Sequence, residues 1–473
     1  VGGEPRYVLD LAKKQLGMGH NVFLLVPGPI KSENDKAYVK KWERYNGIEC
    51  YRVMNPQYIA NGAGVCDPGL FMRKSEVAIY ERWFKEEQPD VIHLHSLMGL
   101  DLEFLLAAKK EKIPVIFTTH DFFGLCPKID LLCDGKTCEE KDWLRCYKCC
   151  ENAISVRRMQ LEQSDIYRFY CKHQWLMKIT HEIVRVKKKL KNEKKIDEEA
   201  KNIELKNERE KYIELQKYYR SMFDNIDYFL FNSRQTREIY EDRLGKMNGK
   251  VIPVFNAAIE DNRKEKKFDR CLKLGFLGNQ TPHKGYAFLI ETLEMLRKTG
   301  RTDFILYTYM LQNDEKKAYI CNQRPFNPNE EEKVFDEIDL LIVPSLCKET
   351  FGMVMMEAFC NGVPSLISKN VGAKMILEDY PDTGKVYKNS KNDARNNYYI
   401  YSIGNVTYSG MGNSELDHSG DDLETKLFIN TVVAAYKAGV EAPDLKILEA
   451  PDKNAAEKKY EYITYDSSLS DKP

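Results

Sequence analysis

Two glutamates in the C-terminal half of the chain have a spacing that suits chemistry. Glu349 follows the apolar run 340–343, and Glu357 comes after Gly352. The pattern predicts a strand, a loop with Glu349, and a helix that carries Glu357 past its first turn. The unpaired N–H groups at a helix start suit a diphosphate, and carboxylates beside them can accept hydrogen bonds from sugar hydroxyls. Glutamates in loops and helices are usually only solvated, so spacing alone leaves both interpretations open.

Polar side chains also follow two strand-like runs in the N-terminal half. The runs 91–95 and 115–119 are separated by a helix-like segment, which predicts parallel strands joined by a crossover helix. Ligands bind beyond the carboxyl ends of such strands. His95, His120 and Asp121 are therefore candidate site residues.

The histidines of these strands are not equivalent. His93 points the same way as His95 but lies deeper in the strand, so we expect it to be structural. For His120 alone, a buried, hydrogen-bonded side chain and a ligand-binding one are both open.

Strand-like and helix-like segments alternate along both halves, which is typical of an α/β fold. In the N-terminal half we expect helices at 7–16, 75–87 and 102–110, and strands at 22–26, 48–53, 91–95, 115–119, 227–231 and 251–254. In the C-terminal half we expect helices at 286–297 and 353–361, and strands at 273–278, 304–309, 340–343 and 363–367. A polar linker at 260–270 divides two Rossmann-like domains, residues 1–260 and 261–405. A C-terminal helix at 423–437 and a tail complete residues 406–473.

An insertion at about 124–226 interrupts the first domain. It begins with a cysteine-rich stretch over 126–150, in which Cys146 and Cys149 have the spacing of two ligands to one tetrahedral ion. Reduced thiols packed in a loop are the alternative. Zinc and an iron–sulfur cluster are not distinguished by the sequence.

The rest of the insertion, residues 156–219, is a polar helical region. Its basic run 185–195 follows the apolar residues Trp175, Leu176 and Met177, a pattern that suits an anionic membrane surface. Acidic residues follow soon after, at 198–210, which favours a solvated helical arm.

Composition excludes several classes of protein. Lys and Arg number 72 among 473 residues, as do Asp and Glu, so no overall charge favours nucleic acid. We find no apolar stretch long enough to span a membrane and no signal peptide. The 13 cysteines are odd in number in a large chain, which favours a reducing cytoplasm over a disulfide framework.

The motifs, taken in order, resemble those of retaining glycosyltransferases of family four, which have the GT-B fold. The acidic segment resembles the family's Glu-x7-Glu signature. Further similarities are the glycine loop and helix at 2–20, the strand-end motifs at 89–95 and 119–121, the phosphate-binding loop at 274–285 and the strand at 339–345. The resemblance covers about residues 1–125 and 227–375. It implies two domains facing a cleft, with His120 and Glu349 on opposite walls.

The resemblance also implies roles for individual residues. Glu357 would bind the ribose, Glu349 the donor sugar near its anomeric centre, and Lys284 the leaving diphosphate, while His120 would approach the sugar from the N-terminal domain. Gly2 and Gly3 would let the backbone come near donor and acceptor. The implied donor-binding set is Gly2, Gly3, Gly278, Asn279, Lys284, Phe351, Gly352, Met353 and Glu357. The family needs no metal for catalysis. Some members carry a cysteine pattern that implies one structural ion held by Cys126, Cys138, Cys146 and Cys149.

The sequence departs from the family pattern in three places. Asn279 stands where the family commonly has an arginine, so one positive charge is missing from the phosphate loop. The stretch 308–334 is short and lacks the usual glycine after its strand. The first strand of the N-terminal domain is not found before Val1, and the sequence leaves open whether the chain is an N-terminally truncated fragment.

We therefore expect a retaining hexosyltransferase that uses a UDP- or GDP-sugar. Its acceptor would be a glycan or a lipid-linked molecule in polysaccharide or glycoconjugate biosynthesis, in the cytoplasm or at the inner face of the membrane. Two alternatives stay open: a sugar-nucleotide epimerase of the same fold, and a non-catalytic GT-B subunit that binds partners. Glu349, Glu357 and Lys284 favour an enzyme, whereas Asn279 and the short C-terminal sheet that we expect favour the inactive subunit.

Overall fold

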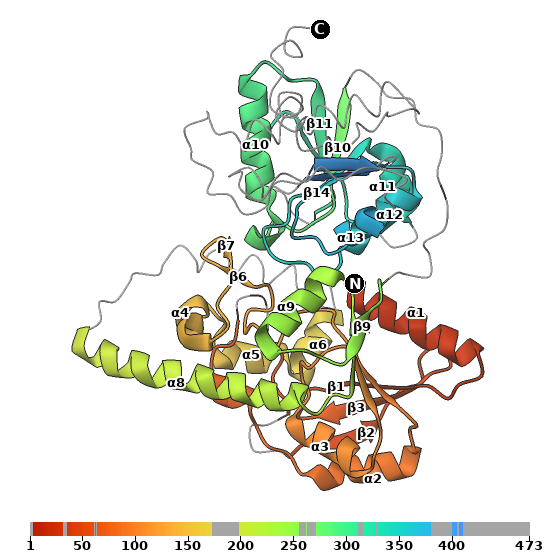
Figure 1. Ribbon diagram of the computed structural model, residues 1–473, viewed down its shortest axis with the longest axis vertical. Coiled ribbons are helices and arrows are strands. Elements are labelled where there is room, and N and C mark those ends of the chain that lie inside the picture. The colour runs from red at the N-terminus through yellow and green to blue at the C-terminus, as the bar shows by residue number, and fades with distance from the viewer. Residues whose placement is uncertain are drawn as a thin grey trace, which may run out of the picture. The chain divides into compact units, whose positions relative to one another are not determined.

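Parallel strands joined by helices form both halves of the chain in the computed structural model (Figure 1). The chain divides into two units. The N-terminal unit is made of Val1–Leu131, Glu139–Phe231 and Arg237–Val251, and the C-terminal unit of Leu132–Cys138, Asn232–Thr236 and Ile252–Pro473. The structure describes residues 3–31, 36–60, 62, 64–172, 198–254, 262, 271–310, 316–326, 330–379, 400–403 and 406–409.

The N-terminal unit begins with a helix and a three-stranded sheet. Helix α1 (Gly3–Gly17) leads into β1 (Phe23–Pro27), which pairs in parallel with β3 (Glu49–Met54). The edge strand β2 (Tyr38–Lys41) pairs antiparallel with β3. The helix, β1 and β3 confirm the prediction. The sequence analysis missed β2, which is four residues long and mostly exposed, and carries two lysines of the kind common on edge strands.

A second sheet of the same unit is wholly parallel, in the order β4-β5-β8-β9. Its strands are β4 (Ile92–Leu94), β5 (Val115–Thr118), β8 (Tyr228–Phe231) and β9 (Gly249–Val251). Its helices are α2 (Val77–Glu87), α3 (Leu102–Lys110) and α9 (Arg234–Leu244). These elements confirm the predicted strand–helix alternation. The last strand ends earlier than predicted, before Pro253, which has no N–H to donate to a ladder.

The insertion adds small elements and three helices. The small ones are the turn η2 (Trp143–Arg145), the hairpin β6 (Leu132–Cys133) and β7 (Lys136–Thr137), and the short helix α4 (Cys146–Cys149). The turn η1 (Pro68–Phe71) lies outside the insertion, between β3 and α2. The longer helices are α5 (Val156–Glu162), α6 (Asp165–Lys172) and α8 (Glu198–Phe223). The predicted basic run 185–195 lies outside the described residues.

The end of α8 is part of the hydrophobic core, which corrects the prediction of a solvated arm. Its buried side chains are Tyr212, Leu215, Tyr219, Met222 and Phe223, all at most 3% exposed. The ring of Tyr219 lies 4.9 Å from that of Phe123, in the loop after β5. The solvated-arm interpretation was wrong here because one apolar face lies among many Lys and Glu residues.

The C-terminal unit contains a seven-stranded sheet in the order β12-β11-β10-β13-β14-β16-β15. Its strands are β10 (Leu272–Phe276), β11 (Phe304–Thr308), β12 (Ile320–Asn322), β13 (Leu340–Val343), β14 (Ser365–Ile367), β15 (Ile400–Ile403) and β16 (Val406–Ser409). Its helices are α10 (Tyr286–Lys298), α11 (Glu331–Glu337), α12 (Met353–Cys360) and α13 (Lys374–Asp379), with the turn η4 (Pro282–Lys284) before α10. All neighbours pair in parallel except β15 and β16.

The strand order places a switch point between β10 and β13. From β10 the chain builds β11 and β12 on one side, then returns to build β13 and β14 on the other. The loops that follow β10 and β13 therefore leave the sheet side by side and in opposite directions. Such a point is where open α/β sheets bind their ligands.

Several predicted segments lie outside the described residues. These are the domain boundary at 260/261, nearly all of the linker at 260–270, and the helix at 423–437. Strand β16 belongs to the main sheet, so the sheet continues past residue 405, where the sequence analysis ended the domain.

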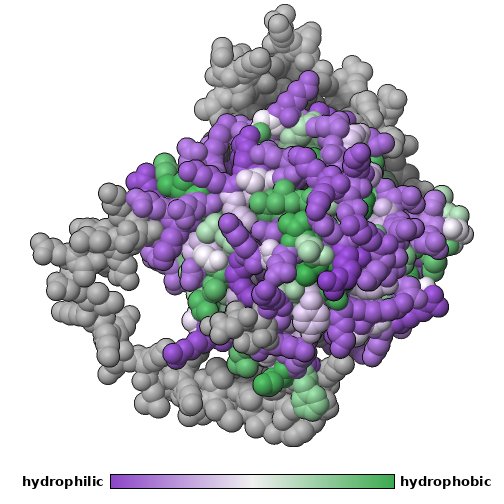
Figure 2. Space-filling model, turned by 90° about the horizontal axis from the view of Figure 1, so that it is seen from below, coloured by the Kyte–Doolittle hydropathy of each residue, from purple (hydrophilic) through white to green (hydrophobic). Residues whose placement is uncertain are grey.

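On the face shown in Figure 2, hydrophilic side chains dominate and apolar ones form smaller patches. Among the described helices, none is long and apolar enough to cross a membrane.

Candidate functional site

The two loops at the switch point are tied together by backbone hydrogen bonds. Residues 277–285 connect β10 to α10, and residues 344–352 connect β13 to α12. The carbonyl of His283 accepts from the N–H of Leu346 at 2.9 Å and from that of Cys347 at 3.2 Å. The first loop is therefore held directly against the loop that carries Glu349.

Two glycines in these loops allow close packing, and each caps a helix. Gly285 has a φ of +73° before α10, and a Cβ there would lie 2.0 Å from the carbonyl oxygen of Pro344. Gly352 has a φ of +98° before α12, and its Cβ would lie 2.5 Å from Cγ1 of Val371. Neither position accepts a side chain without strain.

Lys284 and Glu349 form an ion pair between these loops. The Lys284 Nζ lies 2.9 Å from Oε1 of Glu349, and the side chains are 34% and 13% exposed. Ser345 donates a second hydrogen bond to the same oxygen. Burial by itself would raise the pKa of Glu349, but the charge of Lys284, the two hydrogen bonds and the nearby His283 hold it below its usual value. Burial likewise opposes the charge of Lys284, but Glu349 above all raises its pKa.

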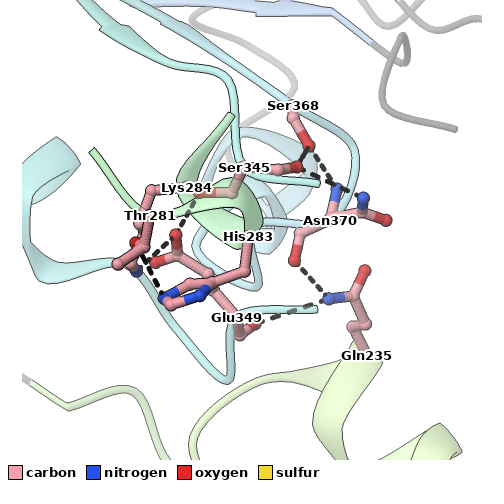
Figure 3. A network of polar contacts seen from close by, with 8 residues as sticks. All are labelled: Gln235, Thr281, His283, Lys284, Ser345, Glu349, Ser368 and Asn370. Carbon is pink, nitrogen blue, oxygen red and sulfur yellow. Dashed lines mark hydrogen bonds and ion pairs between the residues drawn. The ribbon is translucent and has the colours of Figure 1, made fainter. Parts of the chain in front are cut away.

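A buried polar network supports the loop of Glu349 (Figure 3). The carbonyl of Ser345 accepts from the hydroxyl of Ser368 at 2.7 Å and from the amide of Asn370 at 3.3 Å. The Asn370 carbonyl in turn accepts from the N–H of Glu349 at 2.9 Å and from the Gln235 side chain at 2.8 Å. Sequence reasoning missed these residues. The available signal was that Ser368 and Asn370 directly follow β14, at the same edge of the sheet.

The other predicted donor-binding residues of this unit lie around the two loops. Glu357 is on α12, past its first turn as predicted, and is half-buried. Phe351 is buried, whereas Met353 is half-buried at the start of α12. In the loop after β10, Gly278 is half-buried and Asn279 is exposed. These positions are consistent with a site at the switch point, but the individual ligand contacts stay predictions.

The N-terminal unit brings its strand-end histidines together. His95 follows β4 and His120 follows the neighbouring β5, and His95 Nδ1 lies 3.1 Å from His120 Nε2. Tyr7 of α1 places its ring 5.1 Å from the ring of His120 and 5.9 Å from that of His95. Tyr7 was missed by sequence reasoning, although it lies on the helix that follows the glycine loop.

Burial keeps these histidines uncharged. It lowers the pKa of His95 to about 2 and that of His120 to about 4, and neighbouring histidines add to both shifts. His93 has its pKa lowered to about 4 by burial, and its Nε2 lies 2.7 Å from the hydroxyl of Thr118 inside the sheet. The contact agrees with the structural role predicted for His93.

Two carboxyl groups in the same unit have raised pKa values. Burial raises the pKa of Asp121 to about 6, against hydrogen bonds from the Phe123 N–H and the Ser96 hydroxyl. Burial, with the charge of Asp121, raises the pKa of Glu4 to about 7.

Gly3 begins α1, whereas Gly2 lies outside the described residues. How His120 is placed relative to Glu349 involves both units and stays a prediction.

The predicted cysteine site is not formed in this structure. Helix α4 carries Cys146 and Cys149, Cys126 is buried, and Cys138 belongs to the C-terminal unit. The described residues, which include all four cysteines, contain no group of three or more His, Cys, Asp or Glu side chains that could hold a metal ion. A bound ion at these cysteines therefore stays a prediction, which elemental analysis of the purified protein checks.

Sequence comparison identifies the family to which these two units belong. Residues 1–132 match the profile described as "Glycosyltransferase Family 4", and residues 271–396 match "Glycosyl transferases group 1". Together the matches cover more than half of the 473 residues. The paired α/β units and the acidic loop at the switch point thus define a glycosyltransferase of the GT-B class. The chain belongs to the group 1 glycosyltransferases of family four.

Solved structures are similar to the chain at low identity. WaaG, a glycosyltransferase involved in lipopolysaccharide biosynthesis, is 13% identical over 98% of this chain and 97% of its own, with a TM-score of 0.46. Sucrose-phosphate synthase from Thermosynechococcus elongatus is 14% identical over 84% and 82%, with a TM-score of 0.43. HepE of Anabaena, in complex with UDP and glucose, is 14% identical over 63% and 64%, with a TM-score of 0.35. No curated protein sequence matches the chain.

Proposed function

We propose that this glycosyltransferase transfers a hexosyl group, with retention of configuration, from a UDP- or GDP-sugar to a glycan or lipid-linked acceptor. The observation that carries the proposal is the Lys284–Glu349 ion pair at the switch point between β10 and β13. A cation and a carboxylate held in adjacent loops match the two parts of a nucleotide-sugar donor. Its diphosphate is anionic, and its sugar presents hydroxyl groups.

The diphosphate is assigned to Lys284. An ammonium group has three N–H donors, and among the described residues only one of them is engaged, by Glu349. The remaining two can reach phosphate oxygens. The N-termini of α10 and α12 open at the same edge of the sheet and add partial positive charge.

The donor sugar is assigned to Glu349. Both hydrogen bonds to its carboxylate fall on Oε1, and within the described part of the chain Oε2 has no partner. The depressed pKa keeps the group ionised near neutral pH, so Oε2 can accept a hydrogen bond from a sugar hydroxyl. A negative charge at this point also stabilises the positive charge that develops on the sugar ring in an oxocarbenium-like transition state.

In this mechanism Lys284 stabilises the reacting system mainly as the glycosidic bond breaks. The leaving diphosphate gains negative charge only at that stage, so a fixed cation stabilises the transition state more than the ground state. His120 is proposed to contact the donor sugar as a neutral hydrogen-bonding group, because its pKa is held near 4. No metal is assigned a part in this reaction.

We further propose that the acceptor belongs to polysaccharide or glycoconjugate assembly at the inner face of a membrane. Helix α6 supports this proposal, because its side chains Ile166 and Phe169 are 74% and 61% exposed. Apolar side chains of this size on one helix face can enter the interfacial layer of a bilayer. Sedimentation with anionic vesicles, compared for the wild type and Ile166→Ser/Phe169→Ser, tests this part separately.

The experiment for the main proposal is a thermal-shift screen of the full chain against UDP-, GDP- and ADP-sugars. A ligand at about 100 times its dissociation constant adds roughly 2.7 kcal/mol of stability, which raises the melting temperature measurably. Turnover is then measured with the binding donor, and the anomeric configuration of the product is read by NMR.

Each outcome separates the alternatives. Transfer to an acceptor with retention supports the proposal. Conversion of the nucleotide sugar without an acceptor would identify an epimerase. Stabilisation by none of the nucleotide sugars, in a folded protein, would favour the non-catalytic subunit.

A further inference from the structure

His283 lies in the turn η4, directly before Lys284, and the turn is held in place on two sides. The His283 Nε2 lies 3.2 Å from the hydroxyl of Thr281. The His283 carbonyl accepts the N–H groups of Leu346 and Cys347 in the loop that carries Glu349. The backbone position of His283 is therefore fixed relative to that loop.

The side chain of His283 is close enough to Glu349 to act on its charge. It is one of the groups that lower the pKa of Glu349, together with Lys284 and Ser345. Figure 3 shows the imidazole ring beside the side chain of Glu349, at the same end of the turn as Lys284. The ring is half-buried, so one part of it remains accessible.

The charges around Glu349 do not balance when His283 is protonated. One carboxylate then faces two cations, Lys284 and His283, in adjacent positions of one turn. This local excess of positive charge lies at the N-terminal end of α10, where partial positive charge adds to it. A dianionic group such as a diphosphate complements it.

We propose that His283 is a second phosphate-binding residue, which acts beside Lys284 on the diphosphate of the donor. The inference rests on the proposed function, because it assigns a further residue to the same site. An anion that binds the imidazolium form favours protonation, so affinity falls as pH rises through the range in which histidine loses its proton.

The charged groups that face His283 do not change their protonation state over the pH range of the proposed effect. Lys284 on the same turn has a raised pKa, and Glu349 on the neighbouring loop has a lowered one. Both therefore keep their charge between about pH 5.5 and 7.5, the range in which an ordinary histidine titrates. Cys347, also on that loop, is buried.

The test is calorimetric titration of the full chain with inorganic pyrophosphate across this pH range. The variant His283→Gln keeps a group that can hydrogen-bond Thr281 but has no charge. We expect it to bind about tenfold or more weakly than the wild type at the acid end and nearly equally at the alkaline end, since one charge-assisted hydrogen bond is lost. Ionisation of pyrophosphate is common to both proteins and cancels in their ratio. The exposed His20, changed to Gln, is the matched control.

A second variant separates a charge effect from a structural one. His283→Lys carries a permanent charge and should restore affinity while removing the pH dependence of the ratio. A ratio between wild type and His283→Gln that is constant with pH, or equal to one throughout, would overturn the inference. If binding requires Lys284 but not His283, the inference fails and the proposed function stands. If the folded wild type binds no pyrophosphate, both fail.

Discussion

The Lys284 ammonium lies 2.9 Å from Oε1 of Glu349, and Ser345 donates to the same oxygen. The cation assigned to the leaving diphosphate is thus paired with the carboxylate assigned to the sugar. The pairing holds both side chains at the switch point and leaves Oε2 of Glu349 for a ligand. It also couples the two residues, so substitutions of one affect the other.

Substitutions of the two glutamates in the acidic segment should change different kinetic parameters. Glu349→Gln removes a charge that acts where positive charge develops, so we expect kcat to fall by roughly 10²–10³-fold. Glu357→Gln removes the contact that we assign to the ribose. The ribose is held alike in the ground and transition states, so KM should rise and kcat should be spared. Steady-state kinetics with the donor found by screening measures both. If the two patterns are exchanged, the assignment of the residues is reversed.

Lys284→Ala should be the most severe single substitution for turnover. Asn279 leaves the phosphate loop with one cation fewer than the family pattern, so more of the stabilisation falls on Lys284. Turnover equal to that of the wild type would place the site elsewhere.

The same variant should change how stability depends on pH. The pKa of Glu349 is lowered in the folded state, so its ion pair contributes stability above the unfolded pKa of about 4.3, and this is lost as pH falls through the folded value. Between pH 7 and pH 3 the free energy of unfolding should therefore decrease less in Lys284→Ala than in the wild type. Urea unfolding of the two proteins across this range is the measurement, with Lys298→Ala on α10 as the control.

The histidines of the N-terminal unit predict a second pH dependence. Burial lowers the pKa of His95 to about 2, so the unfolded chain binds more protons than the folded one below about pH 6.5. Stability should therefore fall as pH decreases from 6.5, with a slope of at most about 1.4 kcal/mol per pH unit for each such histidine. His95→Gln should flatten this slope in denaturant titrations. An unchanged slope would show that His95 is not held neutral by the fold.

Helix α8 should contribute substantially to the stability of the N-terminal unit. Leu215 is fully buried in its core, and truncation to Ala removes packing that is worth about 2–5 kcal/mol in other cores. The neighbouring Glu214 is exposed on the same helix, so Glu214→Ala should have little effect. Equal stability of both variants in urea unfolding would mean that α8 is the solvated arm that its composition suggested.

The loop of Glu349 was largely predictable from the sequence because residues close together in the chain determine it. An apolar run that ends before Glu349, and Gly352 before the next helix, give the strand, loop and helix in order. Such features need no knowledge of which distant residues meet. The alternation of strands and helices predicts the parallel sheet, whereas the pairing of β10 with β13 is seen only in the structure.

The parts that the sequence did not reveal depend on tertiary contacts. Ser368 and Asn370 reach Ser345 only because β14 pairs with β13. Tyr7 meets His120 through the placement of α1 against a strand end. The buried face of α8 repeats at helical spacing from Tyr212 to Met222, but the surrounding Lys and Glu residues hide it.

Gly285 tests whether the close approach of the two loops is required for the site. A Cβ at this position would lie 2.0 Å from the Pro344 carbonyl oxygen, and the φ of +73° is unfavourable for any other residue. Gly300 provides the matched control, because its φ is +89° but a Cβ added there would meet no atom within 4 Å. Gly300→Ala should therefore cost only the backbone strain of about 1 kcal/mol. Gly285→Ala must also push the loop after β13 away from η4, which lengthens the hydrogen bonds from Leu346 and Cys347 to His283 and separates Lys284 from Glu349. We expect a larger loss of stability in urea unfolding, and a loss of pyrophosphate binding in calorimetry that Gly300→Ala does not show. If the two variants lose stability equally and both keep pyrophosphate binding, the contact between the loops is not what forms the site.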